Sequence, residues 1–143
     1  MNKKIKLAMF MALNSAIMQS AQANIVDNYP SHESNISGSL NGSLTALESS
    51  DDTYQIITET QSQGKPKNRY SYLEHKWQIH LTAGINATLH IEANRTANSE
   101  EDDFVFAYST DDQNYTDIIT VNSNTDAAQT AALPSTLSGL VFI

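Results

Sequence analysis

The 143-residue chain contains no cysteine. It therefore cannot form disulfides, thiolate nucleophiles, cysteine-based zinc sites or iron–sulfur clusters. The Gly-x-Ser-x-Gly, His-Glu-x-x-His and glycine-rich phosphate-loop motifs are also missing, and the chain has only 5 glycines. Because these catalytic signatures are absent, we expect a protein that is not an enzyme.

Basic side chains are scarce as well. The 8 lysines and arginines stand against 16 aspartates and glutamates, which gives a net charge of −8. Binding to nucleic acid or to an anionic membrane needs clustered cationic side chains that displace counterions. The composition therefore argues against both partners and fits a glycan, a cation or a protein surface better.

Long apolar segments are missing too. The clearest apolar run, residues 7–13, is far shorter than the about 20 residues of a membrane-spanning helix. Three lysines precede this run, namely Lys3, Lys4 and Lys6, and residues 21–23 (Ala-Gln-Ala) follow it with the small-x-small pattern of a cleavage site. We expect residues 1–23 to be a cleaved export signal, so that the protein is secreted or periplasmic and has no stable membrane insertion.

Cleavage would leave a chain long enough for one domain. Residues 24–35 show no hydrophobic periodicity, and we expect them to form a flexible lead-in. Residues 36–143 are expected to be the folded domain.

Apolar and polar residues alternate along the middle of this domain. Residues 73–81 and 87–95 each place apolar side chains at odd positions, which predicts two strands that each bury one face. Residues 84–86 (Gly-Ile-Asn) are expected to join them as a hairpin. In that hairpin His80 and His90 would lie directly opposite each other, either as a metal-binding pair or as ordinary surface residues.

Other segments add weaker strand signals. Residues 104–109 and 115–121 are expected to form a second hairpin around an acidic turn. Residues 53–60 are rich in β-branched side chains, and the Asn41-Gly42 pair between Leu40 and Leu44 could close a small hairpin. With no helical periodicity, these segments predict an all-β, antiparallel β-sandwich with jelly-roll-like connections.

The chain ends in an apolar run, residues 140–143 (Leu-Val-Phe-Ile). No turn, polar tail or charged residue follows, although an exposed apolar edge favours aggregation. We expect the domain to be truncated at its C-terminus and to belong to a larger polypeptide in the intact gene product. The alternative is a terminal strand buried at the centre of a sheet.

Three segments carry a resemblance: residues 64–66, 71–77 and 102–111. Over residues 50–143 the chain resembles secreted bacterial β-sandwich accessory domains that accompany exported hydrolases and large surface proteins. The resemblance implies a binding or ancillary module without a defined activity. Residues 108–115 also look like a degenerate Asp-box, a folding turn of sialidases, with Gln113 where that pattern has glycine.

Two groups of residues are candidates for binding. Four consecutive carboxylates could hold calcium together with Asp111, or could form a solvated loop: Glu100, Glu101, Asp102 and Asp103. A basic and aromatic cluster could grip an acidic glycan, or its cations could dock against the acidic turn: Lys65, Lys67, Arg69, Tyr70, Tyr72 and Lys76. From this cluster Arg69, Tyr70 and Tyr72 are the predicted ligand-binding residues.

The sequence thus predicts a secreted, non-catalytic accessory module that binds a glycan or a protein surface and is stabilised by calcium. A structural or adhesive domain is the alternative, with strand addition at the edge next to Ile143. A hydrolase with acids from the loops at residues 49–52 and 100–103 is a third hypothesis.

Overall fold

The computed structural model describes residues 4–15, 24–84, 86–97 and 103–143. Within these residues the secondary structure consists of strands and two short 3₁₀ helices. The elements are β1 (Lys4–Ser15), β2 (Asn24–Asn28), β3 (Pro30–Ser37), β4 (Ser39–Asn41), η1 (Leu44–Leu47), β5 (Gln55–Thr58), β6 (Thr60–Gln61), η2 (Pro66–Asn68), β7 (Ser71–Tyr72), β8 (Glu74–Leu81), β9 (Asn86–Arg95), β10 (Phe104–Tyr108), β11 (Thr116–Val121), β12 (Ala127–Leu133) and β13 (Gly139–Phe142).

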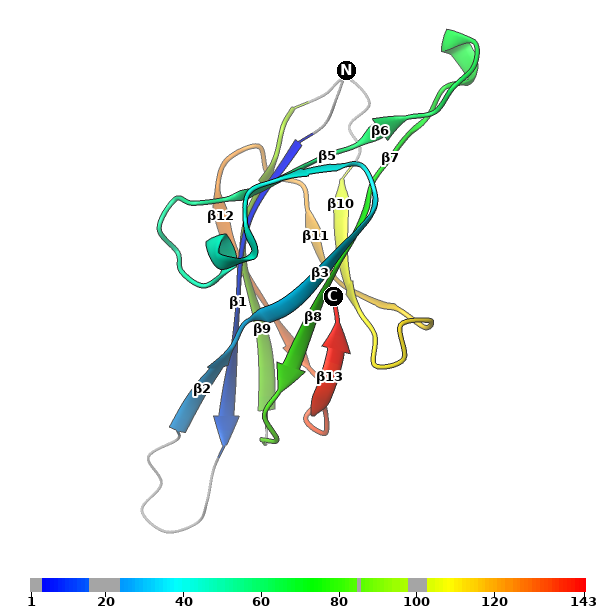
Figure 1. The fold of residues 1–143 in the computed structure, drawn as a ribbon. Coiled ribbons are helices and arrows are strands. Elements are labelled where there is room, and N and C mark those ends of the chain that lie inside the picture. The colour runs from blue at the N-terminus through cyan, green and yellow to red at the C-terminus, as the bar shows by residue number, and fades with distance from the viewer. Residues whose placement is uncertain (1–3, 16–23, 85, 98–102) are drawn as a thin grey trace.

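Apart from the separate two-stranded pair β6-β7, the strands form two layers, and every pairing among the described residues is antiparallel. One layer is a sheet with the order β12-β9-β1-β5-β4, in which β2 also pairs with β1. In front of it in Figure 1 lie the sheet β13-β8-β3 and the pair β10-β11. The predicted all-β, antiparallel fold is therefore confirmed, whereas the jelly-roll connections and the truncation stay predictions.

The hydrophobic core lies between these layers. Trp77, Ile79 and Leu81 of β8 are buried, as are Leu89 and Ile91 of β9, and all five belong to one hydrophobic cluster. The predicted alternation of both strands is therefore confirmed. Burial of such side chains is the main term that holds two sheets together.

The predicted hairpin around residues 84–86 is wrong. β8 pairs with β13 and β3, whereas β9 pairs with β1 and β12. His80 and His90 therefore lie in different sheets and do not form a cross-strand pair. The alternation shows only that each strand buries one face, and facing strands in two layers satisfy that condition as well as paired neighbours do.

The hairpin of β10 and β11 is confirmed, with a bulge between Phe106 and Ala107. The small hairpin at Asn41-Gly42 is wrong, because β4 pairs with β5 and Leu44 begins the 3₁₀ helix η1. Gly42 has a φ of +111°, and a Cβ there would lie 2.7 Å from the carbonyl oxygen of Tyr54. The glycine serves this close approach of two backbones.

The N-terminal part of the chain differs from the expected lead-in. Residues 24–35 lie in β2 and β3, and β3 pairs with the edge of β8. This segment has no apolar periodicity of its own, and it forms a strand because its backbone pairs with that of β8. Residues 4–15 form β1, and cleavage of the leader stays a prediction. No helix among the described residues has the length and apolar character needed to cross a membrane.

Candidate functional site: a cleft between β8 and β10

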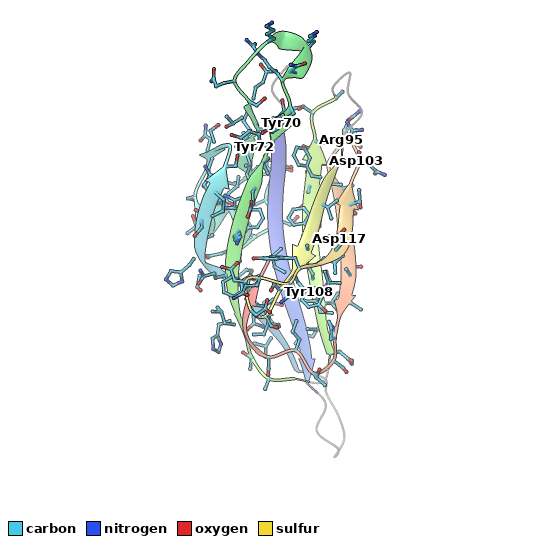
Figure 2. All side chains as sticks on the ribbon, turned by 90° about the vertical axis from the view of Figure 1, so that its right-hand side faces the viewer. Tyr70, Tyr72, Arg95, Asp103, Tyr108 and Asp117 are labelled. Atoms are coloured by element: carbon cyan, nitrogen blue, oxygen red, sulfur yellow. The ribbon has the colours of Figure 1, made fainter. Side chains whose placement is uncertain are left out.

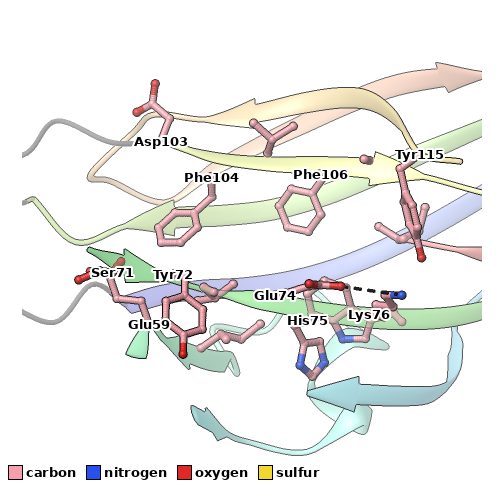
Figure 3. A pocket seen from close by; sticks show the side chains of 16 residues that line it. Glu59, Ser71, Tyr72, Glu74, His75, Lys76, Asp103, Phe104, Phe106 and Tyr115 are labelled. Atoms are coloured by element: carbon pink, nitrogen blue, oxygen red, sulfur yellow. Dashed lines mark ion pairs between the residues drawn. The ribbon is translucent and has the colours of Figure 1, made fainter. Parts of the chain in front are cut away.

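A cleft of about 490 Å³ opens between β10 and the strands β7 and β8. In Figure 3, Phe104 and Phe106 point from β10 towards β8. The deeper wall is apolar and contains Trp77, whose ring stacks on Phe106 with centroids 5.9 Å apart. Tyr72 lines the cleft with 45% of its surface exposed.

One end of the cleft is closed by the last residues of the chain. The backbone N–H and C=O of Ile143 bond to the C=O and N–H of Trp77, both at 2.9 Å. Phe142 forms the same reciprocal pair with Ser109, at 2.9 and 2.8 Å. β13 is thus wedged between β8 and the end of β10, and Ile143 forms part of the cleft wall.

Beyond Ile143 the cleft separates two strand edges. Backbone groups of residues i and i+2 in a strand point to the same side. The backbone of His75 therefore faces the cleft as that of Trp77 does, and the backbone of Ala107 faces it as that of Ser109 does. His75 and Ala107 both line the cleft, so its two sides are strand edges whose backbone groups face the cleft.

Of the predicted ligand-binding residues, Tyr70 and Tyr72 lie together at the surface, whereas Arg69 is bonded within a hairpin. Tyr70 is 67% exposed, and its ring lies 5.6 Å from that of Tyr72, centroid to centroid. Figure 2 shows this pair at the same end of the molecule as Arg95 and Asp103. Arg69 instead donates from Nε to the carbonyl oxygen of Gly64, at 2.8 Å, and so closes the tip of the β6–β7 hairpin.

Lys76 of the basic cluster docks against the acidic turn. Its Nζ lies 2.7 Å from a carboxylate oxygen of Asp112, 3.8 Å from one of Glu74 and 5.4 Å from the ring centroid of Tyr115. The hydrogen bond to Asp112 raises the pKa of Lys76, and the same bond holds the pKa of Asp112 below its usual value. For Lys76, therefore, internal docking is the observed arrangement.

The proposed calcium ligands are not brought together by the described residues. Glu100, Glu101 and Asp102 lie outside them. Asp103 forms an ion pair with Arg95, with 3.1 Å between Oδ1 and Nε. Among the residues that the structure describes, no group of three histidines, aspartates or glutamates is arranged to hold a metal ion.

Asp111 stabilises the turn between β10 and β11. Its carboxylate accepts hydrogen bonds from the backbone N–H groups of Gln113 and Asn114, the Asn114 side chain and the Ser109 hydroxyl. The hydrogen bonds from Asn114, followed by those from Gln113 and Ser109, hold the pKa of Asp111 well below its usual range. The carboxylate is thereby committed to the turn.

Behind the cleft lies a series of hydrogen-bonded polar side chains that was not predicted from the sequence. Trp77 Nε1 donates to Gln55 Oε1 at 2.9 Å, and Gln55 Nε2 donates to Glu33 Oε2 at 2.7 Å. The ring of His75 lies against the same oxygen, with 3.2 Å to Nε2, and its side chain is only 1% exposed. The odd, inward position of His75 between Leu73 and Trp77 was the available signal, whereas Glu33 fell within the expected lead-in.

The loop at residues 49–52 does not support the hydrolase hypothesis, because its aspartates bond locally and lie away from the cleft. Asp51 accepts a hydrogen bond from the backbone of Thr53, and Asp52 accepts one from the Tyr54 hydroxyl. Neither aspartate lines the cleft. Comparisons with family models, curated proteins and solved structures returned no match.

Proposed function

We propose that this protein is a secreted, non-catalytic binding module whose cleft between β8 and β10 takes an extended polypeptide strand in line with β13. The supporting observation is the backbone pairing of β13 at the cleft's closed end. Trp77 and Ser109 hold Ile143 and Phe142 by reciprocal hydrogen bonds. A strand entering in the same line would find the edges at His75 and Ala107 in the same register.

Strand addition draws its affinity from main-chain hydrogen bonds and its specificity from pockets for alternate side chains. Here one side of the cleft offers the rings of Phe104 and Phe106, which suit apolar or aromatic side chains. The bound segment can belong to a partner protein or to the same polypeptide. Both sources offer the same chemistry, and the adhesive role proposed from the sequence would use the same contacts.

Fusing a short strand to the full chain tests the proposal. One variant carries Thr-Val-Thr-Val-Thr after Ile143, and the matched control carries Thr-Pro-Thr-Pro-Thr, in which proline removes the backbone donors. We expect the first extension alone to raise the unfolding midpoint, by about 4 °C for each 1 kcal/mol gained. Equal midpoints for the two variants would overturn the proposal.

A peptide added in trans separates a partner strand from a strand in cis. Trp77 is the only tryptophan and lines the cleft, so its fluorescence reports occupancy. Titrating the free Thr-Val-Thr-Val-Thr peptide into the full chain should change this emission saturably. It should leave the emission of the Thr-Val-Thr-Val-Thr fusion unchanged, because there the cleft is already filled.

A glycan is the second candidate ligand, and the exposed pair of Tyr70 and Tyr72 favours it. A glycan that stacks on these rings would lose affinity in Tyr70→Ala and Tyr72→Ala variants. Val105→Ala is the matched control, because Val105 is 53% exposed and lines the cleft from the other strand. Retained glycan binding in both tyrosine variants would remove this candidate.

A further inference from the structure

β1 is an inner strand of the larger sheet. It pairs on one side with β9, from Ile5–Arg95 to Asn14–Asn86. On the other side it pairs with β5, from Lys4–Thr58 to Leu7–Gln55, and with β2, from Met11–Asn28 to Ser15–Asn24. Figure 1 shows β1 running the length of this sheet between its neighbours. The same residues belong to the leader whose cleavage the sequence predicts.

We infer that cleavage of residues 1–23 opens a strand-wide slot between β9 and the strands β5 and β2, and that this slot binds an extended segment of another polypeptide. The segment would be apolar at every second position and would run antiparallel to β9. This site is separate from the cleft between β8 and β10. The inference shares with the proposed function only the export of the protein.

The chemistry of the slot follows from β9. Its core face consists of four buried side chains with exposed fractions of 0–2%, namely Ala87, Leu89, Ile91 and Ala93. The register places Leu13, Met11, Met9 and Leu7 opposite them. A replacement strand must offer apolar residues at the same alternate positions to cover this part of the core.

Closure of the slot by direct pairing of β5 with β9 is a poor alternative. Both strands are antiparallel to β1, so they are parallel to each other, and parallel ladders are slightly less stable for each residue. β5 is also only 4 residues long against 10 for β9. The rest of the slot is bordered by β2, which is 5 residues long and would likewise be parallel to β9. Closure would therefore require two short strands to shift together into a parallel ladder, and β9 backbone groups left without a partner strand are costly in a sheet interior.

The test uses the processed chain, residues 24–143, recovered after export and checked by mass. The probe is a synthetic peptide of residues 4–15, and its matched control carries Met9→Asp and Met11→Asp. We expect the probe alone to raise the unfolding midpoint saturably and to slow amide exchange at residues 86–95 by about tenfold or more. The unprocessed full chain should respond to neither peptide, because β1 already fills the slot.

Several results would overturn the inference. One is an exported protein that retains residues 1–23. Another is a processed chain whose amides at residues 86–95 are protected without peptide, either by closure or by pairing between copies. If the processed chain is unfolded alone, refolding with the probe must restore a cooperative transition, and failure to do so also overturns it. The extension experiment at Ile143 depends on none of these outcomes, so the two sites are tested separately.

Discussion

At the scale of single residues, a few hydrogen-bonded polar side chains extend from the core towards the surface. Gln55 is fully buried, accepts from the Trp77 indole and donates to Glu33, which also contacts His75. Buried polar groups are stable only when they are hydrogen-bonded. These hydrogen bonds therefore fix the orientation of Trp77 and His75, whose side chains form part of the cleft wall.

His75 makes the stability of the protein depend on pH. Burial lowers its pKa, while Glu33 opposes that shift. The unfolded chain, with a histidine pKa of about 6.5, then binds protons more readily than the folded chain. The free energy of unfolding should fall as the pH drops from 7 towards 5.

Urea unfolding at several pH values checks this prediction. His75→Gln should flatten the slope between pH 7 and pH 5, whatever its effect on the absolute stability. His80→Gln is the matched control, since His80 is exposed on the same strand. An unchanged slope in the His75 variant would contradict the assignment.

Among the elements, the β10–β11 hairpin depends on one carboxylate. Asp111 accepts four hydrogen bonds within the turn, whereas the neighbouring Asp112 bonds to Lys76 and Tyr115. Asp111→Ala should therefore lower the unfolding midpoint by several degrees, and Asp112→Ala by less. Differential scanning calorimetry of both variants measures the difference, and an equal loss would argue against a special role for Asp111.

The lowered pKa of Asp111 also sets the direction in which its contribution to stability changes with pH. A depressed folded-state pKa stabilises the fold above the unfolded value of about 3.9, and this contribution is lost as the pH falls towards the folded-state value. The difference between wild-type protein and Asp111→Ala should therefore persist at neutral pH and shrink in strong acid.

At the scale of the whole molecule, charge is the dominant feature outside the core. With a net charge of −8, the excess acidic side chains repel one another in the compact state. Cleavage of the leader would increase this repulsion, because it would remove three lysines and no acidic residue. Raising NaCl from 10 to 150 mM should therefore raise the unfolding midpoint by a few degrees, because salt screens this repulsion. A midpoint that falls with salt would show that attractive ion pairs dominate instead.

Calcium can be separated from screening in the same measurement. At constant ionic strength, calcium should raise the midpoint above the value with chelator only if a site exists. The variant Asp102→Asn/Asp103→Asn should abolish that increment. Equal midpoints with calcium and with chelator would remove the calcium hypothesis.

Local patterns were enough to predict several elements and part of the site. The alternation of residues 73–81 predicted apolar side chains at the buried odd positions, and Trp77, at one of them, lies in the core. The partners of β8 could not be predicted, because alternation reports which face is buried and not which strand lies alongside. Glu33 was missed because its segment forms a strand only through pairing with β8.

The all-β class, the strands at β8, β9 and β10, the turn at Asp111 and the acidic surface can all be predicted from the sequence alone. These properties follow from residue chemistry and from contacts a few positions apart. Three arrangements emerge only from the three-dimensional fold. β8 and β9 lie in different sheets, β13 lies between β8 and the end of β10, and residues 4–15 lie between β9 and the strands β2 and β5. Backbone hydrogen bonds between distant segments determine these arrangements. Every residue except proline carries the same backbone donor and acceptor, so the sequence pattern does not reveal which strands will pair.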